Sequence, residues 1–321
     1  MELRQLRYFV GIQEAGSLLK ASTRLHVAQP ALGQQMAALE AEVGARLLHR
    51  SSRGVTLTDA GKVFLEHAKV VLNDVERARS AVRESAAVPS GELSIGLTTT
   101  IGLVATVPIL RACRERLPQV RLKVVEAYSG FLREWLVSGR LDLGLLFDDR
   151  ADPALARRPL LEDRLSFISG ANGPTASRRM ALSALARWPL ILPGKGHGLR
   201  RSIDEAIAPL GIELDIVAEM DALSSVKRAV EDGIGCTILP LGAVAEEVAA
   251  QRLNASRIDS PLMTRRIVCA TSVTRPTTPA CAAVIELAVE VIGGMVATGV
   301  WPGRWVGGEA TGGWMPAAAR R

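Results

Sequence analysis

The sequence predicts an α/β protein in two parts: an N-terminal winged helix-turn-helix with a long linker helix, and a larger region of alternating strands and helices. Two observations predict this division. Residues 17–58 combine two short helical patterns with a basic hairpin, and from Glu92 onward short apolar segments alternate with helical ones. The length of 321 residues, about twice that of a typical domain, agrees with more than one domain.

The first helix of this N-terminal segment is expected from Leu18 to Leu25, with Ser17 as its N-cap, because a serine hydroxyl can accept from free amides of the opening turn. After a break at residues 26–28, a second helix opens at Gln29 with Pro30 in its first turn, where the missing N–H costs nothing. Its apolar residues recur with helical spacing and are expected to face a core: Leu32, Met36 and Leu39.

The opposite face of the second helix is small and uncharged, which favours a close fit in a DNA major groove. Gly44 is expected to end the helix, and the hairpin at residues 49–54 forms the wing, whose arginines suit phosphate contact. The alternative, a small helical domain with an incidental charged loop, does not explain the order of these signals. The predicted DNA-binding residues, within the helix-turn-helix from Leu18 to Ala37 and the wing, are Gln29, Pro30, Gly33, Gln34, Arg50 and Arg53.

A long helix is expected from Thr58 to the region before Pro89. Its apolar residues follow a 4,3,4,3,4 spacing typical of a coiled coil: Phe64, Ala68, Val71, Val75, Ala78 and Val82. The first turn or two can pack on the N-terminal domain itself, whereas the remainder predicts a partner helix from a second copy of the chain. We therefore expect a winged domain at 1–58, a dimerisation helix at 59–87 and a hinge at 88–91.

Beyond the hinge, the alternation of strands and helices predicts a mostly parallel sheet covered by helices. The first set has strands at 92–97, 120–126 and 141–147 and helices at 102–116 and 130–138; the second has strands at 165–169, 190–192, 216–219 and 237–239. A strand at 266–270 and a helix at 280–291 are expected to return to the first set.

Ligands collect at the carboxyl ends of such strands, where helix N-termini offer free amides. The residues expected to surround an effector there are Thr98, Thr100, Ser129, Phe147, His197 and Ser224, although Ser and Thr at helix starts can serve only as caps. Nearby Lys195, Arg200 and Arg201 favour a carboxylate-bearing ligand, unless they are solvated surface charges. The glycines at 194, 196 and 198 do not have the spacing of a nucleotide-binding loop.

Composition narrows the classes of protein. A formal charge of +6 favours polyanionic partners. The N-terminus has no signal-peptide core, and no uncharged stretch of 18 residues is expected to span a membrane, so a cytoplasmic location without membrane contact is expected. The four cysteines are scattered and are expected to be buried apolar residues rather than a redox pair, and no metal or cofactor is expected. No Ser, His and Asp set marks an enzyme.

The segment at 298–321 contains three of the five tryptophans in a stretch rich in Gly, Ala and Pro, namely Trp301, Trp305 and Trp314. It shows neither a helical nor a strand period. Disorder is therefore expected, and no function is assigned to it.

Several of these residues form a motif that resembles the N-terminal signature of the LysR-type transcriptional regulators. The motif comprises Leu6-x-x-Phe9, Gly16-Ser17, Leu25, Ala28-Gln29-Pro30-Ala31-Leu32, Leu39-Glu40, Gly44-x-x-Leu47-Leu48-x-Arg50 and Thr58-x-x-Gly61. Residues 26–32, with Leu192-Pro193 and residues 197–200, are most similar to the nitrogen assimilation control subgroup. Two positions depart from the family: Gly33 replaces a usual Ser or Thr, and Leu48 replaces a frequent Phe.

The resemblance implies a two-lobed α/β effector-binding domain of periplasmic-binding-protein type at 92–297, with lobe I at about 92–162 and 266–297 and lobe II at about 163–265. It implies promoter DNA, a small-molecule effector and a homodimer or homotetramer, with RNA polymerase as a candidate further partner. The main hypothesis is a transcriptional regulator modulated by a small, carboxylate-bearing metabolite. The alternative is a regulator that binds DNA without a ligand, for example in nitrogen assimilation. An enzyme or transport-type solute binder is the third and least favoured hypothesis.

Overall fold

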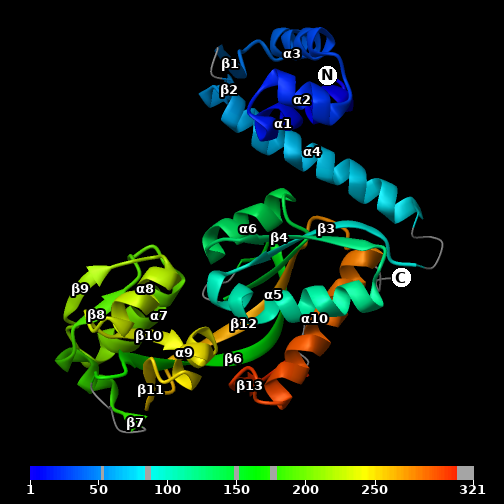
Figure 1. The fold of residues 1–321 in the computed structure, drawn as a ribbon. Coiled ribbons are helices and arrows are strands. Elements are labelled where there is room, and N and C mark those ends of the chain that lie inside the picture. Colours follow the sequence, from blue (N-terminus) through cyan, green and yellow to red (C-terminus); the bar gives the residue numbers. More distant parts are fainter. Residues whose placement is uncertain (52–53, 84–87, 148–151, 174–178, 309–321) are drawn as a thin grey trace. The chain divides into compact units, whose positions relative to one another are not determined.

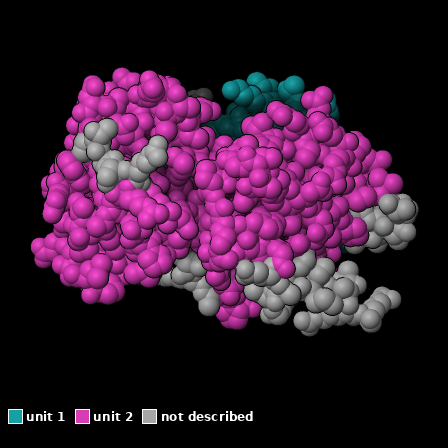
Figure 2. All heavy atoms as spheres, turned by 90° about the horizontal axis from the view of Figure 1, so that it is seen from below, with its two compact units in different colours: residues 1–87, 138–140 teal, residues 88–137, 141–321 magenta. Residues whose placement is uncertain are grey.

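The computed structural model describes residues 1–51, 54–83, 88–147, 152–173 and 179–308 (Figure 1). The chain divides into two compact units, which Figure 2 draws in different colours. One comprises residues 1–87 and 138–140, and the other residues 88–137 and 141–321. Each unit is considered by itself below.

The first unit begins with three helices, α1 (Leu3–Ala15), α2 (Leu18–Leu25) and α3 (Gln29–Val43), followed by strands β1 (Leu48–Ser51) and β2 (Gly54–Leu57). The two strands pair in antiparallel register and form the wing. We call α1–α3 and the wing the reading head. Its core contains the predicted stripe of α3, since Leu32, Met36 and Leu39 are at most 1 % exposed.

Helix α4 (Asp59–Arg83) follows the wing. Its start belongs to the core of the reading head, where Phe64 packs edge-on against Phe9 with ring centroids 5.2 Å apart and Ala68 is buried. Val71, the next residue of the predicted stripe, is 39 % exposed. The side chain of Val82 lies outside the described residues.

The second unit, called the sensor here, opens with a parallel layer. Strands β3 (Gly91–Leu97), β4 (Val120–Glu126) and β5 (Leu143–Phe147) lie in the order β4-β3-β5 and alternate with α5 (Thr99–Arg116) and α6 (Ser129–Ser138). Strand β12 (Thr264–Ser272) joins them antiparallel to β5. With α10 (Pro279–Ala297), these elements form lobe I (Figure 1), which has a large apolar core that includes α5 and α10 and a smaller apolar cluster that includes α6.

The remaining elements build lobe II around a second core. They comprise β7 (Arg179–Met180), β8 (Leu190–Leu192), α7 (Gly198–Ile207), β9 (Ile216–Glu219), α8 (Leu223–Glu231), β10 (Thr237–Pro240), α9 (Ala245–Ala249) and β11 (Leu253–Ile258), with 3-10 turns at Leu182–Arg187, Ala208–Leu210 and Leu241–Val244. Strands β8 and β9 pair in parallel as a small separate sheet.

One strand, β6 (Leu155–Gly170), runs through both lobes. Its first part pairs with β12 in lobe I, and its second part pairs with β10 and β11 in lobe II. The prediction of a strand only at 165–169 therefore missed the first half of β6. In that half, the charged residues Arg157 and Arg158 and the following Pro159 interrupt the apolar pattern. The prediction of a mostly parallel sheet is wrong for the strands around β6, which runs antiparallel to β10, β11 and β12, whereas β4-β3-β5, β7-β11 and β8-β9 are parallel.

The prediction of disorder from residue 298 onward is wrong for residues 298–308. Trp301 is 2 % exposed and belongs to the core of lobe I, and strand β13 (Gly303–Trp305) pairs antiparallel with β6. Arg304 also bonds Glu162, and this hydrogen bond lowers the pKa of that carboxyl below its usual range. A composition rich in Gly and Pro gave no sign of these contacts because they come from tertiary packing. Residues 309–321, with Trp314, lie outside the described residues.

Helix α10 is long and apolar enough to cross a membrane, with a mean hydropathy of 2.0 in its most apolar window. Its buried residues, however, pack in the core of lobe I, and Arg116 and Arg158 bind its two glutamates at 2.7 Å. These contacts identify it as a core helix.

Candidate functional site

The reading helix α3 begins and ends where local signals place it. The hydroxyl of Ser17 accepts from the Lys20 amide at 3.1 Å and caps α2, and Pro30 occupies the first turn of α3. Gly44 ends α3 in the left-handed conformation, with φ of 73°. Local contacts therefore fix where α3 begins and ends. This determines which side chains its solvent-exposed face presents.

Most of the predicted DNA-binding residues lie on the surface of the reading head. Gln29, Pro30 and Gln34 are exposed on α3, Gly33 is partly exposed between them, and the side chain of Arg50 is 40 % exposed on β1. The Cβ position of Gly33 lies 3.8 Å from the Arg50 guanidinium, so the arginine reaches across the position where the family usually has a hydroxyl. Arg53 lies outside the described residues.

Glu40 ties the wing to α3, a role that the sequence analysis missed. One of its carboxylate oxygens accepts from the backbone amides of Leu47 and Leu48 at 2.8 and 3.0 Å, and the other lies 3.9 Å from Arg50. The available signal was an acidic residue seven and eight positions before the two backbone amides at the entry to β1, which need acceptors. Glu40 is therefore a positioning residue for Arg50.

Two glycines permit the close approach of the wing to the helices. A Cβ at Gly61 would lie 2.0 Å from the carbonyl oxygen of Leu47, and one at Gly54 would lie 2.6 Å from that of Gly16. The Gly16 carbonyl instead accepts from the Val55 amide at 2.9 Å. Both positions require glycine, since any side chain would push the wing away from the helices that it contacts.

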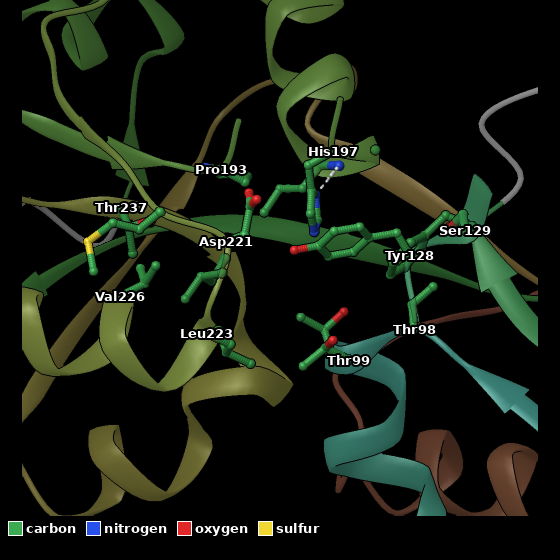
Figure 3. Close-up of a pocket in the computed structure, with 16 residues that line it drawn as sticks. Thr98, Thr99, Tyr128, Ser129, Pro193, His197, Asp221, Leu223, Val226 and Thr237 are labelled. Carbon is green, nitrogen blue, oxygen red and sulfur yellow. Dashed lines mark hydrogen bonds between the residues drawn. The ribbon is translucent and has the colours of Figure 1, made fainter. Parts of the chain in front are cut away.

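In the sensor, a cavity of about 50 Å³ lies between lobes I and II at the carboxyl ends of the strands (Figure 3). Lobe I contributes the segment after β3, the segment after β4 and the end of β5. Lobe II contributes the loop before α7, the β9–α8 connection and β10. Of the predicted effector residues, Thr98, Thr100, Ser129, Phe147 and His197 line it.

Ser224 is the predicted effector residue that does not line this cavity. It is exposed in the first turn of α8, whose N-cap is Ala222 and not Ser224. The predicted helix start was displaced because Ser224 offered the nearest capping side chain, whereas the chain enters α8 two residues earlier without a side-chain cap. Leu223, its neighbour, lines the cavity instead.

Thr98 is a buried polar residue of the cavity, with 5 % exposure. It occupies the N-cap position of α5, yet its side chain makes no capping bond, and its Oγ1 has no hydrogen-bond partner among the described residues. The Oγ1 atom of Thr100 is likewise buried without such a partner. These hydroxyls are therefore not explained as helix caps.

Tyr128 and Asp221 also line the cavity and were missed by the sequence analysis. Their side chains point toward one another from opposite lobes (Figure 3). Burial raises the pKa of Tyr128, and the charge of Asp221 and a hydrogen bond to it raise this pKa further. Neither residue lies in a motif, so only their positions directly after β4 and β9 could have indicated them.

His197 has a structural role beside its place in the cavity wall. Its Nδ1 accepts from the Leu199 amide at 3.0 Å and so caps α7, while its ring packs edge-on against Tyr128 with centroids 4.9 Å apart. Tyr128 of lobe I therefore contacts two side chains of lobe II.

The basic residues that favoured a carboxylate ligand do not line this cavity. Arg200 is 5 % exposed and binds Asp204, Glu219 and the carbonyl of Pro193. Lys195 is exposed, and Arg201 is not among the lining residues either. Among the described lining residues, Asp221 is the one Asp, Glu, Lys or Arg.

Phe147 lines one side of the cavity and contacts a buried ion pair. The Arg265 guanidinium lies 3.9 Å from the centre of the Phe147 ring and bonds Asp163 at 3.1 Å. Arg265 and Asp163 face each other across β12 and β6, and burial lowers the pKa of the arginine and raises that of the aspartate. The ion pair thus connects Phe147 to β6 and β12, the strands that join the lobes.

The cysteines lie outside the cavity lining, and all four are buried thiols that form no disulfide with one another. Burial raises the pKa of Cys236 to about 11 and that of Cys269 to about 12. Among the residues that the structure describes, no group of three or more His, Cys, Asp or Glu is placed to hold a metal ion.

A winged head in which α3 exposes an uncharged face, joined to a two-lobed unit with a cavity between the lobes, defines a DNA-binding regulator of the ligand-sensing type. Residues 3–62 match the bacterial regulatory helix-turn-helix protein family, lysR type, and residues 86–293 match the LysR substrate binding domain. The chain belongs to the LysR family of DNA-binding transcriptional regulators.

Individual relatives agree with this assignment. The chain is 33 % identical to the nitrogen assimilation regulatory protein nac of Klebsiella aerogenes over 293 residues, which cover 91 % of this chain and 95 % of that protein. It is similar to the crystal structure of CbnR, a LysR family transcriptional regulator, with a TM-score of 0.71, 25 % identity and coverage of 91 % and 99 %. Full-length CbnR with its target DNA gives a TM-score of 0.70, 26 % identity and coverage of 91 % and 100 %.

Proposed function

We propose that this protein binds promoter DNA in the cytoplasm as a homodimer or homotetramer, and that a small molecule between the lobes modulates its output. The exposed face of α3 carries the first part of this proposal, since Gln29 and Gln34 can reach base edges while Arg50 lies beside them for phosphate contact. The related structure of full-length CbnR in complex with its target DNA supports the same kind of partner.

Residues of α4 beyond the head core support a partner copy. Val71 is exposed on the predicted coiled-coil stripe, and two heads on one dimer would make the second half-site contact intramolecular. Membership in a family of regulators supports a protein without enzymatic activity, and RNA polymerase is a candidate further partner.

The test is selection of binding sites from a randomised DNA library with purified full-length protein, with and without a panel of small metabolites. We expect a palindromic motif whose footprint changes with one class of compound. Absence of any enriched motif would refute the DNA-binding role of α3.

A second candidate is a regulator of nitrogen assimilation that acts without an effector. The name of the nac relative supports the pathway, and the small size of the cavity together with the Tyr128–Asp221 contact supports closure without a ligand. A motif upstream of nitrogen-assimilation genes whose footprint no compound alters would favour this candidate over the first.

A further inference from the structure

The two lobes offer opposite chemistry to the cavity between them. Lobe I presents hydrogen-bond donors, because the segment after β3 opens α5 and the segment after β4 opens α6, and the first amides of a helix have no partner within it. The buried hydroxyl of Thr98, without a hydrogen-bond partner among the described residues, lies at the same place. This side suits a ligand carboxylate.

Lobe II presents a carboxylate. Asp221 accepts from the Gly194 amide at 3.0 Å, and its charge acts on the Tyr128 hydroxyl opposite it. A carboxylate has about four acceptor positions, so some remain for a ligand. With neither Lys nor Arg among the described lining residues, this side suits an ammonium group and repels a second carboxylate.

The cavity also limits the size of its ligand. A volume of about 50 Å³ corresponds to roughly four water-sized spheres, taking about 10–15 Å³ for each. The walls between the two polar sides are apolar, with Leu223, Val226 and Leu239 from lobe II and Phe147 from lobe I. A short aliphatic body fits between them.

We propose that the ligand of this cavity is a small zwitterion, an amino acid of two or three carbons, whose carboxylate binds the Thr98 side and whose ammonium binds Asp221. The proposal rests on the proposed function in that the cavity is taken as the effector site. It replaces the carboxylate-only ligand that Lys195, Arg200 and Arg201 suggested, and it makes the ligand a bridge between the lobes.

Three probes of matched size test it: alanine, propionate, which lacks the ammonium, and ethylammonium, which lacks the carboxylate. Isothermal titration with the full-length protein should give alanine an affinity roughly tenfold or more above both others, because each of the other probes lacks one charge-assisted hydrogen bond. Equal or tighter binding of propionate, or no binding of any probe, would overturn the proposal.

Substitutions assign the two ends of the ligand. Asp221→Asn should lower alanine affinity to that of propionate and leave propionate binding unchanged or tighter. Thr98→Val should weaken alanine and propionate but not ethylammonium, and Thr98→Ser should restore them. Asp232→Asn, at an aspartate of lobe II outside the cavity lining, is the matched control. Unchanged alanine affinity in Asp221→Asn, with the variant folded by circular dichroism, would also overturn it.

DNA footprints separate this inference from the proposed function. If alanine binds through Asp221 but leaves the footprint unaltered, the zwitterion site stands and effector control of DNA binding fails. If the footprint instead responds to a compound whose binding does not depend on Asp221, effector control stands and the zwitterion site fails.

Discussion

The reading head and the sensor assemble their sites over very different lengths of chain. In the head, contacts that fix α3 and the wing join residues 7 to 39 positions apart, from Glu40 with Leu47 and Thr58 with Arg46 to Val55 with Gly16. In the sensor, the cavity joins Thr98 of lobe I to residues as distant as Leu239 of lobe II. The head site therefore depends on local folding, whereas the sensor site depends on how the lobes are connected.

The largest effect that tests this difference is expected from Trp301→Ala. Loss of a fully buried indole should lower the free energy of unfolding of the sensor by about 3–5 kcal/mol, because it leaves a cavity in the core of lobe I. Urea unfolding followed by circular dichroism measures the change, with the exposed Val300→Ala as control. DNA affinity below the transition should stay unchanged; its loss would contradict the separation of the two sites.

Glu40→Ala examines the head in the same way. Two backbone amides lose their acceptor, so we expect a loss of about 1–3 kcal/mol in the stability of the head together with weaker DNA binding. Chemical unfolding and fluorescence anisotropy with labelled DNA measure both. Glu40→Gln, which retains an acceptor oxygen, should fall between wild type and Glu40→Ala, and equal losses for both variants would argue against the positioning role.

Gln34→Ala and Arg50→Ala separate base recognition from backbone contact. Loss of a bidentate contact by Gln34 should reduce discrimination at one base pair by about 1–3 kcal/mol, whereas loss of Arg50 should weaken all sequences alike and reduce the salt dependence. Binding to a set of single-base operator variants at several salt concentrations measures this. A changed base preference in Arg50→Ala alone would reverse the assignment.

Gly33→Ala should stabilise the head by up to about 1 kcal/mol, because glycine is a poor residue for a helix interior. The added Cβ would meet only the Arg50 guanidinium, at an ordinary contact distance of 3.8 Å. Gly44→Ala is the contrasting variant, since its φ of 73° disfavours any side chain, and it should destabilise the head. Thermal unfolding of the two variants should move in opposite directions.

The smallest expected effect concerns the cysteines. Burial and the raised pKa values of Cys236 and Cys269 keep their thiols protonated, so a thiol-reactive disulfide such as DTNB should react slowly with the native protein at neutral pH. All four thiols should react on unfolding in urea. Rapid reaction of one native thiol would indicate that the sensor opens more readily than its packing suggests.

The same contrast explains which features the sequence could predict. Ser17, Pro30 and Gly44 act within a few residues of their own positions, so their types alone placed α2 and α3, whereas α1 was not predicted. Arg200 was misassigned although a local signal existed, because Asp204 follows it by four residues, the spacing at which a helix pairs opposite charges.

The features that could not be predicted depend on partners distant in sequence. Trp301 is buried against a core built mainly by residues before position 293, and nothing in its own segment of Gly and Pro indicates that core. Asp221 becomes part of a site only because Tyr128 of the other lobe lies opposite it. Hydrophobic periodicity reports which face of a segment is buried and not which segment covers it.

Strand β6 has a consequence for dissecting the molecule. One continuous strand supplies hydrogen bonds in both lobes, to β12 and β13 in lobe I and to β10 and β11 in lobe II. Lobe I is also built from two separate stretches of the chain, since β3, α5 and β5 precede lobe II in sequence whereas β12 and α10 follow it. Cutting the chain near residue 163 would break this strand in its middle and divide lobe I between two fragments. The sensor should therefore be expressed, exchanged between regulators or fused to reporters only as a whole, with residues 298–308 included.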